Sequence, residues 1–235
     1  MHRIESQMRK AIENYQMIDE GDKIAVALSG GKDSIALLYC LNNMRRYYPK
    51  HYDIHVITIN PGFDGFDDNL ISNLCKELDV PYTIVPTQIK QIVFDERKEK
   101  NPCSLCANLR RGILCSTAKE LGCNKIALGH NEDDVLETFL MNLTYAGRID
   151  TIPPVGYMDR SEITIIRPLI YVTEKMTRGF IKRNNIKVIG KVCEVDGNTN
   201  RENALNLLKQ LEKENKHVRA NIYGAIKRSN IKGWK

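Results

Sequence analysis

The chain lacks any apolar run long enough to cross a membrane. A secretory leader would show a continuous apolar segment near its start, but the N-terminal stretch "MHRIESQMRKAIENYQMI" intersperses charged residues among apolar ones at helical spacing. Since these signals are missing, we expect a cytoplasmic protein without a membrane partner.

A linker rich in proline, glycine or serine is also missing, as are internal repeats and low-complexity segments. The 235 residues are enough to bury one substantial core. We therefore predict one compact unit, with a main domain including an N-terminal helix over residues 1–200 and a basic helical tail over residues 201–235. The net charge of +6 suits a polyanionic partner, although proteins without one often carry such a charge.

Short β-branched runs alternate with helical patterns through most of the chain. The expected strands cover residues 24–28, 52–60, 81–87, 124–130 and 162–170. This alternation predicts an α/β fold with an open, mostly parallel, doubly wound sheet and helices on both faces. Ligands of such sheets collect beyond the carboxyl ends of the strands, where the segments "SGGKDS" and "GHNEDD" both fall. We expect these two loops to share one site.

The segment "SGGKDS" joins an expected buried strand to an expected helix. Its residues are Ser29, Gly30, Gly31, Lys32, Asp33 and Ser34. The glycines allow successive N–H groups to form a concave nest for phosphate at the helix N-terminus. The lysine can neutralise phosphate, the hydroxyls can donate to it, and the carboxylate can hold Mg²⁺ or orient the nucleotide. The G-x-x-x-x-G-K-[ST] loop of kinases is absent, and a simple capped turn is the alternative interpretation.

The segment "GHNEDDVLET" begins at Gly129 and opens another expected helix. The adjacent carboxylates of Asp133 and Asp134 repel each other unless a cation or a cationic side chain lies nearby. They can bind Mg²⁺ together with the phosphates of ATP, or they can simply stabilise the positive end of a helix. His130 is either a ligand contact or a satisfied histidine at the end of a strand.

Seven cysteines in a cytoplasmic chain do not predict disulfides, because that compartment keeps thiols reduced. Four of them lie in or beside apolar helical patterns and are expected to pack, namely Cys40, Cys75, Cys115 and Cys123. Cys103 and Cys106 instead form a C-x-x-C motif, and Cys193 stands apart from it. The three thiols are compatible with a redox pair, part of a zinc site, or a [4Fe-4S] cluster with one open iron.

The hexapeptide resembles the pyrophosphate-loop signature of the PP-loop ATPases, which cleave ATP between the α and β phosphates. "GHNEDDVLET" is similar to the partner motif of the tRNA-modifying branch of that superfamily. The resemblance implies an adenine nucleotide alpha hydrolase-like fold and activation of a nucleobase carbonyl by adenylation, with Asp33 holding Mg²⁺. The ATP-binding residues it implies are Ser29, Gly30, Gly31, Lys32, Asp33, Ser34, Gly129, His130 and Asp134, and the catalytic ones are Lys32, Asp33 and Asp133.

"NPCSLCANLRRGIL", together with both nucleotide motifs, is similar to the tRNA 2-thiocytidine synthetase (TtcA) family over roughly residues 21–200. The resemblance implies that Cys103, Cys106 and Cys193 hold a [4Fe-4S] cluster that delivers sulfur to an anticodon-loop cytidine. It also implies a homodimer and a sulfur donor, either a cysteine desulfurase or sulfide. The third cysteine departs from the family, because "VCEVDG" replaces the usual "PCNLCG" setting.

Basic residues beside the C-x-x-C motif and near the C-terminus are the expected tRNA contacts. They are Arg110, Arg111, Lys227 and Arg228. The last twenty residues contain no Asp or Glu but include Tyr223 and Trp234, so they suit phosphate contact and base stacking. A solvated helix face is the alternative, and deletion of residues 216–235 should weaken tRNA binding in a salt-dependent way.

Three other functions remain open at this point. A lysidine-synthetase-like tRNA ligase would share both nucleotide motifs but would leave the three cysteines without a role. A tRNA uridine thiolase is close in chemistry, although many carry paired-cysteine zinc modules that this sequence does not contain. A non-catalytic, metal-bearing RNA-binding protein would be excluded by ATP-dependent formation of AMP.

Overall fold

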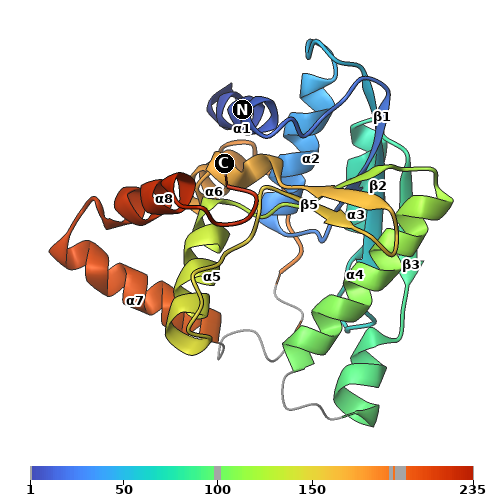
Figure 1. Cartoon of the computed structure of the whole chain (residues 1–235). Helices are drawn as coiled ribbons and strands as arrows, with labels where there is room; N and C mark the ends of the chain where they lie inside the picture. Colours follow the sequence, from blue (N-terminus) through green and yellow to red (C-terminus); the bar gives the residue numbers. More distant parts are fainter. Residues whose placement is uncertain (1, 98–101, 191–192, 194–199, 235) are drawn as a thin grey trace.

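An open six-stranded sheet forms the centre of the protein (Figure 1). The computed structural model describes residues 2–97, 102–190, 193 and 200–234. The strands are β1 (Asp22–Ala27), β2 (Tyr52–Asn60), β3 (Tyr82–Pro86), β4 (Lys125–Ala127), β5 (Val155–Met158) and β6 (Ile163–Ile166). Their spatial order is β3-β2-β1-β4-β6-β5, and only the pairing of β5 with β6 is antiparallel. The predicted open, mostly parallel sheet is therefore confirmed.

Edge strand β5 is the one strand that the sequence pattern missed. Its sequence "VGYM" contains one β-branched residue and a glycine, so it resembles a loop. Its pairing with β6 supplies its order, and Glu162 lies in the turn between the two strands with a φ of 56°. Tertiary pairing rather than local preference thus decides this strand.

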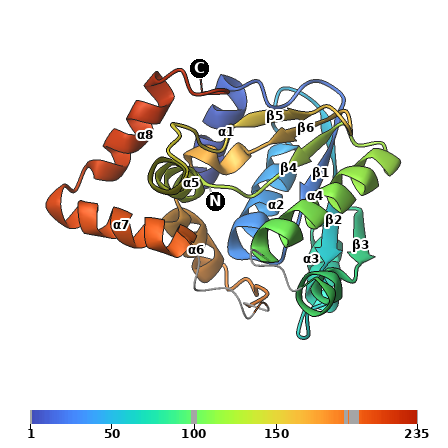
Figure 2. The same ribbon diagram turned by 60° about the horizontal axis from the view of Figure 1, so that its bottom comes forward.

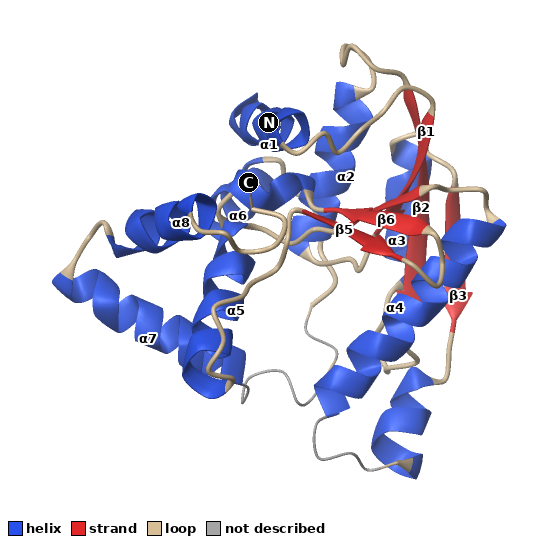
Figure 3. Ribbon diagram, viewed as in Figure 1, coloured by secondary structure: helices blue, strands red, loops and turns tan. Residues whose placement is uncertain are grey.

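Helices cover both faces of the sheet (Figure 3). The α-helices are α1 (His2–Asn14), α2 (Lys32–Met44), α3 (Asp68–Glu77), α4 (Pro102–Glu120), α5 (Glu132–Tyr145), α6 (Glu174–Arg183), α7 (Asn200–Glu214) and α8 (Val218–Arg228). A π-helix, η1 (Gln91–Glu96), and a 3-10 helix, η2 (Pro168–Tyr171), complete the set among the described residues. No described helix is both long enough and apolar enough to cross a membrane.

The alternation of side chains along β1 explains the two layers. Ile24 and Val26 face the larger core, which includes α1, α2, α3, α5 and α6. Ala25 faces the smaller core, where Leu114 and Ala118 of α4 pack against the sheet. The C-x-x-C motif lies in the first turn of α4, which Pro102 opens.

The C-terminal helices α7 and α8 pack against α5 at one side of the molecule (Figure 2). The expectation that Tyr223 and Trp234 stack on RNA bases is wrong, because both side chains are buried. The Tyr223 hydroxyl donates to the carbonyl of Ile170, and the Trp234 indole donates to that of Ile152. Deleting residues 216–235 would therefore remove core side chains as well as basic ones.

We predict that Trp234→Ala destabilises the fold by about 3–5 kcal/mol, the usual cost of deleting a buried aromatic side chain. Trp234 is 1% exposed and contacts the rings of Tyr15 and Tyr223. Urea unfolding followed by circular dichroism measures this loss. Tyr157→Ala is the control, since Tyr157 is 58% exposed and its loss should cost at most about 1 kcal/mol. Equal midpoints for the two variants would contradict the prediction.

Candidate active site

Parallel pairing of β1 with β4 brings the two predicted motifs together. Val26 pairs with Ala127, so the loops that follow these strands leave the sheet at the same edge. Gly129 then lies against the first turn of α2, where a β-carbon on it would approach the Ser34 nitrogen to 3.0 Å. The glycine permits this contact, and the two loops form one site as the sequence predicts.

The hexapeptide turns sharply at Gly30, whose φ is +78°, and its two hydroxyls hold the turn. Ser34 Oγ donates to the Gly31 carbonyl at 2.9 Å and accepts from the Ser29 nitrogen at 3.2 Å. Because the Ser34 proton is used in this way, Ser29 must donate in the 3.1 Å contact between the hydroxyls. The serines therefore organise the loop in addition to any contact with phosphate.

A segment after α6 packs directly on this loop. The Ile189 nitrogen donates to the Gly30 carbonyl at 2.9 Å, and a β-carbon on Gly30 would overlap the Ile189 side chain. Gly30 is thus required both for its positive φ and for this close approach. Ile189 and Cys193 line the same cavity, so the loop is tethered to the segment of the third cysteine.

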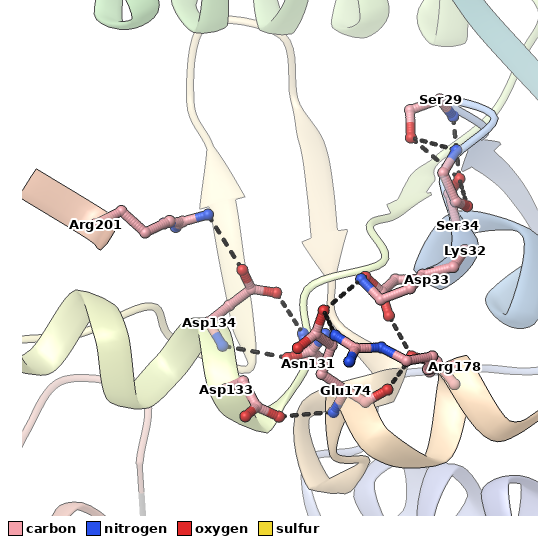
Figure 4. Close-up of polar contacts among 12 residues, drawn as sticks. Ser29, Lys32, Asp33, Ser34, Asn131, Asp133, Asp134, Glu174, Arg178 and Arg201 are labelled. Atoms are coloured by element: carbon pink, nitrogen blue, oxygen red, sulfur yellow. Dashed lines mark hydrogen bonds and ion pairs between the residues drawn. The ribbon is translucent and has the colours of Figure 1, made fainter. Parts of the chain in front are cut away.

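Lys32 and Asp33 take part in a network with α6 (Figure 4). Lys32 Nζ lies 2.9 Å from an oxygen of Asp33 and 2.8 Å from one of Glu174. Burial by itself would lower the pKa of Lys32, but the hydrogen bonds that Lys32 donates to Glu174 and Asp33 outweigh it and raise the pKa. The Thr177 hydroxyl donates to the other Asp33 oxygen, so this carboxylate is held from both sides, by Lys32 and by Thr177.

Arginines pair with the two adjacent carboxylates in the first turn of α5. The sequence predicts cationic partners here, because adjacent carboxylates repel each other. Asp133 accepts from Arg219 of α8 and from the backbone nitrogen of Glu174. Asp134 accepts from the Asn131 nitrogen in a capping box, and Arg201 of α7 lies 3.2 Å from its other oxygen. These carboxylates therefore stabilise the start of the helix and bind the C-terminal helices to it.

A cavity of about 420 Å³ lies between the hexapeptide, the strand ends and α4. Its lining is Ala27, Leu28, Ser29, Gly31, Lys32, Asp33, Ser34, Ile57, Ile59, Ala107, Arg110, Arg111, Leu114, Cys115, Ile126, Leu128, Gly129, His130 and Ile165. We call it the nucleotide cavity, because apolar strand ends adjoin a phosphate-type loop. Asp133 and Asp134 do not line it.

His130 has a defined protonation state in this cavity. Arg167 Nε donates to His130 Nδ1 at 3.2 Å, so the ring proton lies on Nε2. Burial, with the Arg167 charge adding to it, lowers the pKa of His130 to about 3. His130 is therefore a neutral hydrogen-bond donor at physiological pH rather than a cation.

A second cavity of about 630 Å³ adjoins the first, and Cys103, Cys106 and Cys193 all line it. We call it the cysteine cavity. Both cavities are bounded by Ser29, Gly31, Lys32, Ile59 and Arg110. Burial raises the pKa of the Cys106 thiol, and the nearby Arg110 charge opposes this. Within the described residues, no three potential ligands converge closely enough to hold a metal ion, so the thiols share a cavity without forming a closed site.

The four expected tRNA contacts fall into two separate places. Arg110 and Arg111 lie on α4 and line the nucleotide cavity. Lys227 and Arg228 lie at the end of α8 and line neither of these cavities. Lys227 Nζ lies 4.6 Å from the ring centre of Tyr171. The C-terminal pair thus lies outside both cavities.

Several side chains of the site were missed by the sequence reasoning. They are Arg167, Glu174, Thr177, Ile189, Arg201 and Arg219. The repulsion between the adjacent carboxylates indicated that cationic side chains lie nearby, but it did not identify which arginines they are. The other residues belong to no local sequence motif. They lie at the site because the fold brings distant segments together.

The comparisons with known proteins agree with this geometry. A PP-loop domain family matches residues 1–209, so the chain is a PP-loop protein. A curated tRNA-cytidine(32) 2-sulfurtransferase of Geobacter sulfurreducens is 37% identical over 95% of this chain and 88% of its own. That of Syntrophotalea carbinolica is 38% identical over 92% and 85%. The chain belongs to the tRNA-cytidine(32) 2-sulfurtransferase family, and the resemblance seen in its motifs is confirmed.

Solved structures support the fold. A U34-tRNA thiolase, NcsA, from Methanococcus maripaludis, solved with its [4Fe-4S] cluster, matches with a TM-score of 0.74 and 26% identity. The match covers 94% of this chain and 76% of that one. An NH3-dependent NAD synthetase from Campylobacter jejuni matches with a TM-score of 0.51 and 15% identity over 93% and 86%. This second likeness concerns the fold alone.

We predict that Gly30→Ala lowers the free energy of unfolding of the nucleotide-free protein by about 2 kcal/mol, because the left-handed conformation and Ile189 both oppose a β-carbon. Gly31→Ala is the matched control. Its β-carbon would meet only Ser29 Oγ at 3.5 Å, so we expect a change within about 0.5 kcal/mol. Urea unfolding measures the stability of both variants. If the Gly30→Ala variant is as stable as the Gly31→Ala variant, the close contact between Gly30 and Ile189 does not matter for stability and the prediction is wrong.

Proposed function

We propose that this protein is an ATP-dependent tRNA thiolase that converts a cytidine of the anticodon loop, nucleotide 32, into 2-thiocytidine. The supporting observation is that two cavities adjoin at the phosphate loop, one lined by the hexapeptide and apolar strand ends and the other by three cysteines. The curated relatives are named for sulfur transfer to cytidine 32 of tRNA. The chemistry needs both compartments, because the base oxygen must first become a leaving group and sulfur must then replace it.

ATP would occupy the nucleotide cavity with its phosphates on the hexapeptide. The N–H groups at the start of α2 and the charged Lys32 would stabilise the pyrophosphate as it leaves. Lys32 would then exchange its ion pair with Glu174 for one with phosphate. Asp33 would hold Mg²⁺, for which carboxylate and phosphate oxygens are suitable ligands. His130 Nε2 would donate a hydrogen bond to the nucleotide.

The donor set of the cysteine cavity fits a [4Fe-4S] cluster with one iron left open. Thiolates are the usual ligands of such clusters. Three cysteine thiolates would bind three of the iron atoms and leave the fourth iron open to bind the sulfur that is transferred. When bound, the cluster would supply the sulfur that replaces the base oxygen. Cys103, Cys106 and Cys193 would lose their protons and move together on loading, and Arg110 favours the Cys106 thiolate.

The remaining partners follow from the family resemblance. Arg110 and Arg111 would contact the anticodon loop beside the site, and Lys227 and Arg228 would contact tRNA phosphates further away. The sulfur donor would be sulfide or a cysteine desulfurase. We also propose that the protein acts as a homodimer in the cytoplasm.

A uridine thiolase is the second candidate, because the solved thiolase with a TM-score of 0.74 is named for U34 of tRNA. Cytosine and uracil share the 2-carbonyl that would be adenylated, so the two cavities suit both bases. Mass spectrometry of tRNA nucleosides separates the two functions. A strain without the gene should lose 2-thiocytidine and keep its 2-thiouridines.

We predict that Cys193→Ala, purified without oxygen, abolishes thiolation of tRNA and lowers the iron content from about four atoms per chain. Cys123→Ala should keep both, since Cys123 is buried in the smaller core and away from the cysteine cavity. Iron and sulfide analysis, together with nucleoside mass spectrometry, measures the effect. Full thiolation by an iron-free Cys193→Ala protein would reject the cluster.

Lys32→Ala tests the nucleotide cavity separately. We expect at least a hundredfold loss of tRNA-dependent AMP formation, because the loop loses its phosphate-binding charge. The iron content should stay unchanged, since Lys32 carries no thiol. Measurement of AMP release by chromatography decides this. Wild-type rates of AMP release would exclude the assigned role of the loop.

A further inference from the structure

Three phenylalanines line the cysteine cavity, and the function proposed above gives them no role. Phe63 and Phe66 belong to the loop between β2 and α3, and Phe94 belongs to the π-helix η1. The rings of Phe63 and Phe94 meet edge to face, with centroids 5.7 Å apart and an interplanar angle of 69°. All three side chains are half-buried. They form one wall of the cavity, which we call the aromatic wall.

The aromatic wall is separate from the main core of the fold. Phe94 packs against a small cluster around Ile89, Val93 and Cys106, whereas Phe63 and Phe66 belong to none of the buried clusters. Half-exposed rings beside the cations Lys32 and Arg110 are typical of a pocket for a flat, polar ligand rather than of a folding core.

The other walls of the cavity restrict what that ligand can be. Ser29, Gly31 and Lys32 of the phosphate loop bound it on one side, and the three cysteines bound it as well. A group in this space lies within reach of both the nucleotide phosphates and the thiols. In the proposed reaction only the target base must meet both, because its oxygen is adenylated and then replaced by sulfur.

We propose that Phe63, Phe66 and Phe94 form the stacking site of the target pyrimidine, which leaves the anticodon loop and inserts into the cysteine cavity. This inference rests on the proposed tRNA thiolase function. Bases extruded from single-stranded loops are commonly held on aromatic rings. Arg110, at the boundary of the two cavities, is suited to the adjoining phosphate.

Stacking determines how tightly the base is held and does not choose the base. Every base offers a π-face, so the aromatic wall would accept cytosine and uracil equally. Removing a ring should therefore weaken productive binding of the RNA without changing the preference between the two bases. Binding of ATP should not change, because none of the three rings lines the nucleotide cavity.

The test uses the cluster-loaded protein with ATP and an anticodon stem-loop RNA that carries the fluorescent analogue pyrrolocytidine at the target position. Wild type should change the fluorescence on binding as the base leaves its stack. Phe66→Leu keeps an apolar side chain but loses the ring, so the fluorescence change should vanish. The KM for natural tRNA in thiolation should rise about tenfold. Phe66→Tyr should restore both, since it keeps the aromatic face.

The iron content and the ATP affinity of each variant separate stacking from a structural role. We expect both to equal wild type in Phe66→Leu. Tyr47→Leu is the control, because Tyr47 is 52% exposed and follows the end of α2 opposite the phosphate loop. It should leave every readout unchanged.

The inference is overturned if Phe66→Leu retains the fluorescence change and the wild-type KM, or if it loses iron and thereby marks the ring as a wall of the metal site only. These results presuppose a wild-type protein that thiolates tRNA. If wild type releases no AMP and thiolates no tRNA, then the proposed function fails, and the aromatic wall fails with it. The wild-type controls therefore distinguish the two failures.

Discussion

The parallel pairing of β1 with β4 is the constraint on which the site depends. It places the phosphate-type loop and the acidic segment at the same edge of the sheet, although they are about a hundred residues apart in sequence. Gly129 then allows the second loop to touch the first turn of α2. Without that contact the nucleotide cavity would lose one wall, because His130 and Gly129 line it together with the hexapeptide.

A series of charged contacts links the phosphate loop to the C-terminal helices. Arg219 binds Asp133, Asp133 accepts from the backbone of Glu174, and the Glu174 carboxylate binds Lys32. Each contact is at least partly shielded from water, so it is screened less than an exposed pair. The helices after residue 200 therefore help to hold the lysine of the phosphate loop, although they line neither of its cavities. The acidic turn of α5 links the two ends of this series, because Asp133 contacts both Arg219 and the backbone of Glu174.

The site has two compartments because the phosphate loop is shared between them. Lys32 and Arg110 border both cavities, so one pair of cations serves the nucleotide side and the cysteine side. Ile189 tethers Gly30 to the segment that carries Cys193. Ile189 therefore contacts the phosphate loop and also lines the cavity of the third cysteine.

The sequence by itself determined the elements whose signals are local. Periodic apolar residues defined five of the six strands, and the hexapeptide and the C-x-x-C motif marked the two parts of the site. β5 was missed because "VGYM" has weak strand preference and is ordered by its partner β6. Tyr223 and Trp234 were wrongly predicted as RNA contacts, because the many basic residues around them suggested an exposed segment, whereas both aromatic side chains are buried.

Only the tertiary structure decided which distant side chains meet. Arg219 on Asp133, Ile189 on Gly30 and Glu174 on Lys32 join residues that no local pattern connects. Local propensity acts over a few residues, whereas these contacts depend on how the sheet orders its strands and where the connecting chain returns. The sequence therefore indicated the chemistry of the motifs. Their assembly into two adjoining cavities depended on the packing of the whole fold.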